Sequence, residues 1–336
     1  MGSRVTTAPA TTGSAAADYQ ALEAAAAWYA TLHGETASAA ERQAWQAWLK
    51  QSEAHARAWA HIEAVSQRFA PLRAGGHQAA LAGIKAARRS SPGRRQVLAG
   101  LAGAAGLGLA GWLGWRHTAL PAALLAWGAD YRTAIGEQRQ ITLADGSQVW
   151  LNTHTALSVD YRAGARLLRL AAGEILIQTG HDPHGRPFYV DTRHGRLQAL
   201  GTRFSVRQEE EQTRLNVFES AVELSNRAGQ VQRIEAGQGV AFSADGIAPV
   251  QPAERAREAW HRGLVVAENI PLQALIDELA RYQSGHIGVA PEVAALSVMG
   301  VYPAHDMERA LAMLENTLPI RIRRPLPWWV TVEARP

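Results

Sequence analysis

The chain has 336 residues, no cysteine and a formal net charge of +4. Without cysteine, disulfides, thiolate metal sites and a cysteine nucleophile are excluded. Residues 71–95 carry six Lys or Arg and no acid, whereas 1–70 (five basic, six acidic) and 116–336 (23 basic, 24 acidic) are each nearly neutral. One basic segment in an otherwise balanced chain argues against a nucleic-acid-binding domain and indicates contact with anionic lipid.

The N-terminal part is expected to be a disordered tail followed by a small helical module. Residues 1–16 are rich in Ala, Thr, Ser and Gly, whereas 17–70 show helical periodicity. Ser38 and Glu41 form the pattern of a capping box at the start of a second helix, and Ser52 can cap a third. A module of this size has little room to bury its four Trp side chains completely. Either all four fill the core, or some of them leave apolar surface that contacts a partner. The candidate partner-binding residues are Trp28, Tyr29, Leu32, Trp45, Trp48, Leu49 and Trp59.

Two stretches of this module resemble the cytoplasmic anti-sigma domain of FecR-family sigma regulators. They are 27–32 (AWYATL) and 45–55 (WQAWLKQSEAH), the second followed by Ala58-Trp59. The family pattern usually has Pro directly after the Ser, as in S-P-x-H, where this chain has Glu53. The resemblance implies that 17–70 binds an extracytoplasmic-function sigma factor.

Residues 96–115 contain no charged residue and follow the basic linker 71–95. Twenty helical residues span the ~30 Å hydrocarbon core of a bilayer. The positive flank predicts a single-pass protein of the inner membrane with a cytoplasmic N-terminus and a periplasmic C-terminus. A buried core helix is the alternative, and Arg94-Arg95 leaves twin-arginine and Sec insertion both open. The residues predicted to set the topology are Arg88, Arg89, Arg94 and Arg95.

Residues 127–250 change to an alternation of period two, with recurrent Gly turns, which predicts an all-β domain. A sandwich, a jelly roll and a solenoid all fit this pattern. The motifs of serine hydrolases, zinc proteases and P-loops are absent from the sequence. His181 and His184 lie in a Pro/Gly turn, which favours a solvated loop over a metal site. The acidic run 209–211 is read as a solvated face. We expect no enzyme activity, cofactor or metal.

Seven blocks in this region resemble, in order, the FecR periplasmic domain. The resemblance implies a periplasmic FecR domain and raises self-cleavage at the Gly201–Thr202 bond, in which the Thr hydroxyl would attack the preceding carbonyl. The alternative is that Gly201 turns the chain and Thr202 caps the next strand. The blocks are 131–139, 143–147, 151–153, 173–174, 186–188, 200–206 and 237–238.

Residues 260–334 alternate strands and helices in the order βαββαβ, which predicts a small α+β sandwich with its helices on one face of a sheet. The order resembles the secretin/TonB short N-terminal fold that ends FecR-family proteins. The resemblance implies contact with the N-terminal signalling domain of a TonB-dependent outer-membrane transducer. The candidate contact residues, which could equally just pack the sheet, are Trp260, Tyr282, Trp328 and Trp329.

The sequence therefore predicts a multidomain membrane protein that regulates a sigma factor in response to a periplasmic signal. Family resemblance adds iron-chelate uptake as the usual output and intramembrane and periplasmic proteases as further partners. The glycines of 96–115 weaken that helix and so favour its cleavage. Inhibition alone and a requirement for sigma-factor activity both remain open. The alternatives are a membrane-anchored scaffold and a polysaccharide-acting enzyme, for which no carboxylate pair is identified.

Overall fold

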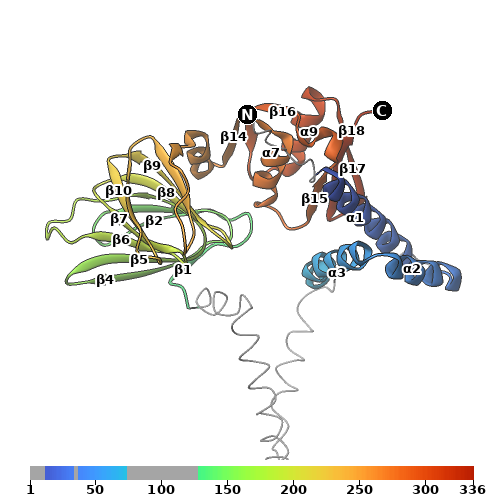
Figure 1. Ribbon diagram of the computed structural model, residues 1–336, viewed down its shortest axis with the longest axis horizontal. Coiled ribbons are helices and arrows are strands. Elements are labelled where there is room, and N and C mark those ends of the chain that lie inside the picture. Colours follow the sequence, from blue (N-terminus) through green and yellow to red (C-terminus); the bar gives the residue numbers. More distant parts are fainter. Residues whose placement is uncertain (1–11, 34–36, 74–127) are drawn as a thin grey trace, which may run out of the picture. The chain divides into compact units, whose positions relative to one another are not determined.

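The computed structural model describes residues 12–33, 37–73 and 128–336, and Figure 1 shows them in colour. They belong to two compact units, one combining 1–84 with 265–336 and the other comprising 85–264. Within the described ranges, no helix is both long and apolar enough to cross a membrane. The predicted membrane segment 96–115 and residues 74–95 of the basic linker lie outside these ranges, as do residues 1–11.

The N-terminal module consists of α1 (Thr12–Leu32), α2 (Ala39–Gln51) and α3 (Glu53–Arg73). The predicted capping box is present, with the Glu41 amide donating to Ser38 Oγ at 3.2 Å and the Ser38 amide donating to Glu41 Oε2 at 2.7 Å. Ser52 Oγ accepts from the His55 amide at 3.1 Å, so it caps α3 as predicted. Residues 12–16, expected in the tail, belong to α1. Ala15 and Ala16 favour helix, which accounts for the last two of these five residues.

The core of this module lies between α1 and α3, and α2 contributes no buried residue to it. Tyr29 packs against Trp59, with ring centroids 6.0 Å apart. The same cluster includes Trp328 and Trp329 from the C-terminal region. Its other buried members are Ala21, Ala25, Ala26, Ala58, Ile62 and Val65.

The β domain is one antiparallel-rich sheet of thirteen strands. Its central order is β11-β10-β7-β6-β5-β8-β9-β12-β13. Of the remaining four strands, β3 and β4 each pair with β5, β2 pairs with β3, and β1 pairs with β4. The strands are β1 (Tyr131–Arg132), β2 (Arg139–Thr142), β3 (Gln148–Leu151), β4 (Ala156–Arg162), β5 (Ala165–Gln178), β6 (Phe188–Asp191), β7 (Gly195–Ala199), β8 (Arg203–Gln208), β9 (Thr213–Glu219), β10 (Ala221–Asn226), β11 (Val231–Glu235), β12 (Gln238–Phe242) and β13 (Gln251–Pro252).

Strand β5 joins the two halves of this sheet. Its first half pairs with β4 and β6, and its second half pairs with β3 and β8. Between the halves, Gly173 has a φ of +86°, and a Cβ there would lie 2.3 Å from Thr155 Oγ1. Glycine is required at position 173 because it alone adopts this φ readily and leaves room for Thr155, and the bend there lets the sheet curl into a half-barrel around its core.

The inner face of the half-barrel carries the residues that the sequence alternation predicted. Val149, Ile175 and Val217 are each fully buried there. The sequence left a sandwich, a jelly roll and a solenoid open. The strands do not form a sandwich of two separate sheets, because β5 belongs to both halves of one sheet. After β13, the 3-10 helix η1 (Arg255–Arg262) ends at Gly263, which is left-handed with a φ of 74°.

The C-terminal region comprises β14 (Leu264–Pro271), α7 (Leu272–Ala280), β15 (His286–Val289), α8 (Pro291–Ala294), β16 (Ser297–Pro303), α9 (Met307–Thr317), β17 (Ile320–Leu326) and β18 (Trp329–Ala334). The predicted α+β class is confirmed, including the predicted last strand from Trp329, and the one-turn helix α8 was not predicted. The prediction that these strands form a single sheet is wrong, because β14-β16 and β15-β18-β17 form separate sheets. Parallel pairing of β15 with β18 groups three strands apart from β14 and β16.

Candidate functional site

Helix α2 presents a half-buried aromatic face in the N-terminal module. Trp45, Trp48 and Leu49 are all partly exposed and pack against the core of the module rather than within it. The Trp48 ring stacks on His55 at 4.4 Å, and the His55 ring nitrogen lies 2.9 Å from the Trp48 carbonyl. These contacts fix the indole in place while leaving part of it open. Rigid, partly exposed indoles are typical of protein-binding surfaces.

The other predicted sigma-factor contacts divide between surface and core. Trp28 and Leu32 are partly exposed, whereas Tyr29 and Trp59 are buried. Tyr29 Oη shares a hydrogen bond with Ser66 Oγ, which ties α1 to α3. The structure thus separates residues that shape the module from residues a partner can reach.

The Gly201–Thr202 bond lies in the turn that enters β8. Gly201 has a φ of +79° and open space where a Cβ would be, so its role here is conformational. The Thr202 amide donates to Thr179 Oγ1 at 2.9 Å, and the Thr202 hydroxyl donates to the Glu219 carbonyl. Thr202 is 3 % exposed. In this arrangement the hydroxyl is engaged by a carbonyl acceptor.

Each of the four aromatic residues predicted to contact a transducer is at most 5 % exposed: Trp260, Tyr282, Trp328 and Trp329. Trp328 lies edge-on to Tyr29 at 5.3 Å, so part of its cover comes from the N-terminal module. Trp329 stacks on His286 at 3.7 Å. The carbonyl of Trp260 accepts from Gln138 Nε2 at 2.9 Å, which places this residue in the β domain.

The sequence reasoning missed an exposed apolar strip on β16. Met299 is 77 % exposed and Val301 is 48 % exposed, and alternation along a strand puts both on one face. β16 pairs with β14 in a two-stranded sheet, which leaves its other edge unpaired among the described residues. An exposed edge with apolar side chains is a place where another chain can add a strand. The signal in the sequence was weak because Gly300 interrupts the run.

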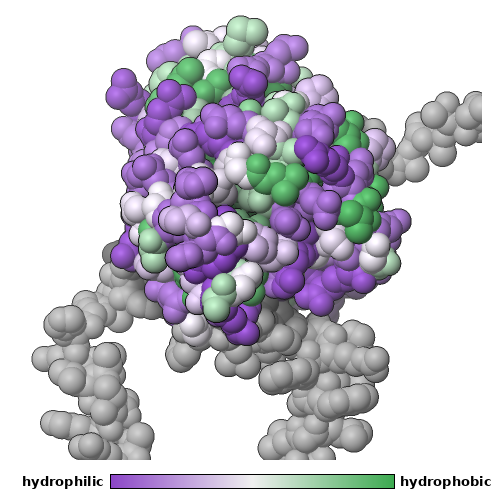
Figure 2. Space-filling view, turned by 90° about the vertical axis from the view of Figure 1, so that its left-hand side faces the viewer, coloured by the Kyte–Doolittle hydropathy of each residue, from purple (hydrophilic) through white to green (hydrophobic). Residues whose placement is uncertain are grey.

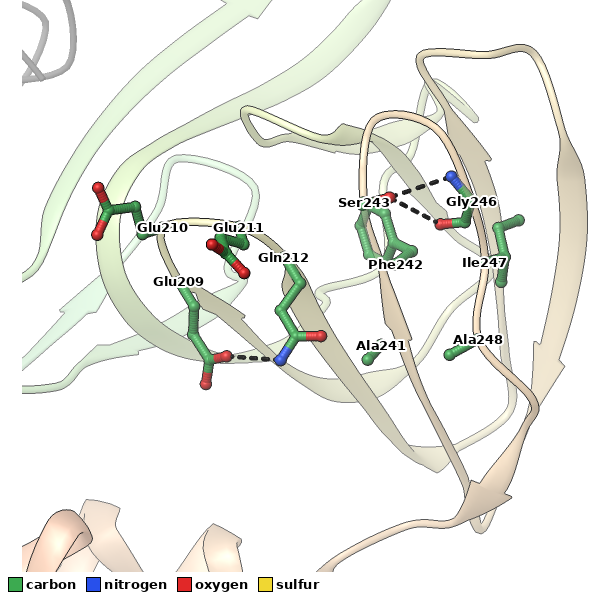
Figure 3. A pocket seen from close by; sticks show the side chains of 10 residues that line it. All are labelled: Glu209, Glu210, Glu211, Gln212, Ala241, Phe242, Ser243, Gly246, Ile247 and Ala248. Carbon is green, nitrogen blue, oxygen red and sulfur yellow. Dashed lines mark hydrogen bonds between the residues drawn. The ribbon is translucent and has the colours of Figure 1, made fainter. Parts of the chain in front are cut away.

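An open depression of about 710 Å³ lies beside the acidic loop of the β domain (Figure 3). Glu209 accepts from Gln212 at 2.9 Å and from Arg214 at 3.0 Å. Burial raises the pKa of Glu209, but Gln212, Arg207 and Arg214 outweigh it and hold the pKa below its ordinary value. Glu209 therefore stays ionised, and its negative charge is balanced by Arg207 and Arg214 of the same domain.

No group of three or more potential ligands is arranged to hold a metal ion among the described residues. In the predicted His loop, His181 and His184 are exposed, and the Asp182 carboxylate pairs with Arg186 at 2.8 Å. This hydrogen-bonded pair lowers the pKa of Asp182. On the face shown in Figure 2, hydrophilic residues predominate and the hydrophobic ones form small separate patches. Such patches are ordinary for a protein surface.

Comparison with known proteins identifies two parts of the chain. Residues 129–223 match the family model described as FecR protein, and residues 23–65 match a domain of unknown function, DUF4880. The β domain is therefore a FecR domain, preceded by a separate N-terminal family domain. No curated protein matches the chain.

Two crystal structures of one bacterial protein share the fold. They show a protein from Parabacteroides distasonis described as a "putative anti-sigma factor", at 1.65 and 2.50 Å resolution. Each is 24 % identical to this chain with a TM-score of 0.51, and each match covers 61 % of this chain. The matches cover 98 % and 97 % of those chains. The chain therefore contains a match to the FecR family in its β domain and a match to DUF4880 in its N-terminal module.

Proposed function

We propose that this protein is an inner-membrane anti-sigma factor that binds an extracytoplasmic-function sigma factor through its N-terminal helices. The observation that carries the proposal is the half-buried indole face of α2, in a module that matches a family domain placed before a FecR domain. The shared fold with a protein described as an anti-sigma factor supports it. The basic segment 71–95 and the charge-free segment 96–115 support a membrane crossing between the two domains.

The proposed topology puts the helical module in the cytoplasm and the FecR domain with the C-terminal region in the periplasm. A chain that crosses once between them cannot keep the contact between Tyr29 and Trp328. The aromatic side chains of the module would then be exposed in the cytoplasm, and those of the C-terminal region would be exposed in the periplasm. The module would offer its face to the sigma factor, and the C-terminal region would offer Trp328, Trp329 and the β16 strip to an outer-membrane transducer.

Capture by the cytoplasmic fragment tests the central claim. Residues 1–90 on a resin should retain a sigma factor encoded beside this gene. Retention of the sigma factor in the presence of 1 M salt would mark apolar rather than purely ionic binding. A fragment that folds by circular dichroism and retains no sigma factor contradicts the proposal and favours a membrane-anchored scaffold.

Signal release is proposed to use proteolysis. Cleavage within 96–115 would free a cytoplasmic fragment of about ten kilodaltons, small enough to diffuse with its sigma factor. Immunoblotting with an N-terminal tag should show this fragment on induction. Its absence throughout induction contradicts release by cleavage.

Self-cleavage at Gly201–Thr202 remains a separate proposal. The left-handed Gly201 supports it by allowing strained backbone at the bond, but the Thr202 hydroxyl must first leave the Glu219 carbonyl. On a denaturing gel the unmodified chain should give two bands and Thr202→Ala one. The same bands from both would remove the proposal.

A further inference from the structure

The 3-10 helix η1 connects the last strand of the β domain to the C-terminal region, and it is held on the sheet by three side-chain contacts. Glu258 Oε1 lies 2.5 Å from an Arg203 guanidinium nitrogen, and the Trp150 ring meets the His261 ring edge-on at 5.7 Å. Gln138 Nε2 donates to the Trp260 carbonyl at 2.9 Å. These contacts come from β8, β3 and the turn before β2, so η1 crosses several strands.

The surface under η1 is the outer face of the half-barrel. Leu176 is fully buried although its neighbours Ile175 and Ile177 point into the inner core. Its cross-strand partners are Trp150 on β3 and Ser205 on β8, which share its face. The contacts of η1 with Arg203, Trp150 and Gln138 surround this position, so η1 lies beside Leu176 on the outer face.

Several features make η1 weakly held compared with the sheet. It is a 3-10 helix of eight residues with no side-chain hydrogen bond at its N-cap. Such helices have poorer hydrogen-bond geometry than α-helices. Trp260 is 3 % exposed, and its Nε1 has no hydrogen-bond partner. A buried donor without an acceptor opposes the docked position.

Next to η1, Gly263 supplies a flexible joint. It is left-handed, with a φ of 74°, and its amide donates to the Trp260 carbonyl at 2.7 Å. The boundary between the two compact units falls one residue further, after Leu264. The helix thus belongs to the β domain while it is docked, and the chain can pivot just after it.

We propose that η1 is a releasable linker helix that docks on and leaves the outer face of the FecR sheet while the sheet stays folded. Undocking uncovers Leu176 and Trp150, and it lets eight residues extend. Extension from ~2.0 to ~3.3 Å per residue lengthens the tether to the C-terminal region by about 10 Å. The contact Arg203–Glu258 carries the release to the Gly201–Thr202 turn, because Arg203 directly follows that bond.

The test is native-state hydrogen exchange on the full chain in detergent or nanodiscs, independent of any sigma factor. In the unmodified chain, the Gly263 amide and the amides of η1 should exchange much faster than those of β10, because they open without global unfolding. Exchange of η1 at the β10 rate would overturn the proposal without any mutation.

The variant Glu258→Gln should speed exchange of the Gly263 amide roughly tenfold, since it removes a largely buried charge-assisted hydrogen bond. The β10 amides should be unchanged. Glu254→Gln is the matched control, because the side chain of Glu254, the N-cap residue of η1, pairs with Arg257 of η1 itself. Equal effects of the two variants would contradict the proposal.

A double-mutant cycle protects the test against simple misfolding. Arg203→Gln and Glu258→Gln should each accelerate exchange of η1, and the double variant should add little to either alone. Additive effects would show that the two side chains do not act as one contact, which overturns the assigned docking.

Discussion

At the scale of single residues, Gly173 is the position on which the curl of the FecR sheet depends. A Cβ there would meet the Thr155 backbone at 2.5 Å as well as its hydroxyl, and the φ of +86° is itself unfavourable for other residues. Backbone atoms cannot move aside as a flexible side chain would. The bend between the halves of β5 therefore requires glycine.

Gly173→Ala is predicted to destabilise the FecR domain by about 3 kcal/mol or more, because strain and overlap act together. Urea unfolding followed by tryptophan fluorescence measures this. Gly185→Ala is the matched control: Gly185 has a φ of +64° and open space around its Cβ position. It should cost only about 1 kcal/mol. Equal losses would mean that the overlap with Thr155 is not what matters.

Where the N-terminal module packs on the C-terminal region as in the structure, His286 makes the stability of the pair depend on pH. Burial, and then the charge of His61, lowers the pKa of His286 from 6.5 to about 4. The unfolded chain therefore takes up a proton at higher pH than the folded chain. Stability from this group is complete above pH 6.5 and falls as the pH drops toward 4, by at most roughly 3 kcal/mol.

Thermal unfolding from pH 7 to 4 checks this dependence. His286→Phe keeps a flat ring against Trp329 but cannot be protonated, so its melting temperature should fall less over this range. Parallel curves for the two proteins would assign the loss to other groups.

At the scale of secondary-structure elements, α2 is the helix whose side chains can contact a partner without forming the core of the module. It contains no buried residue, yet Trp45 and Trp48 pack on the module. Trp59 on α3 is buried and holds the core. Substitutions on α2 should therefore affect a partner more than the fold.

Trp48→Ala is predicted to weaken sigma-factor binding by about 2 kcal/mol, roughly thirtyfold, with a small change in melting temperature. Trp59→Ala should instead lower the melting temperature markedly, because it leaves a core cavity. Calorimetry and thermal unfolding separate the two effects, with the exposed Gln46→Ala as control. Unchanged binding by Trp48→Ala would remove α2 from the interface.

Local patterns predicted many of these elements. The capping box at Ser38, the period-two strands and the helices that begin at Leu272 and Met307 all follow from nearest-neighbour chemistry. The sharing of β5 between two halves, and the division of the C-terminal strands into two sheets, depend on contacts distant in sequence. Periodicity carries no information about such pairing.

For the candidate sites, the sequence identified aromatic residues but not their exposure. Trp260 was a candidate for a transducer interface, and in the structure it is a buried residue of η1 whose carbonyl accepts from Gln138 of the β domain. The exposed Met299 was missed, since an apolar residue on a strand is usually buried. Which face of a strand is open depends on what packs on it, and that is a tertiary property.

At the scale of the whole molecule, the contact between the N-terminal module and the C-terminal region brings like titratable groups together. Burial and a hydrogen bond shared with Glu333 raise the pKa of Glu23. On the same contact, His61 Nε2 lies 3.4 Å from His286 Nδ1. Facing carboxyls and facing imidazoles disfavour this association when charged. Ionisation of both members of either pair would therefore favour separation of the N-terminal module from the C-terminal region, as the proposed membrane topology requires.

The measurement that tests the account most directly is the membrane topology, and the absence of cysteine in the chain allows single-cysteine labelling without background. Lys50→Cys reports the helical module and Met299→Cys the C-terminal region, and both positions are exposed. In intact cells with a permeabilised outer membrane, a membrane-impermeant maleimide should label Met299→Cys and reach Lys50→Cys only after lysis. Equal labelling of both before lysis would put the two ends in one compartment and contradict the proposed relay.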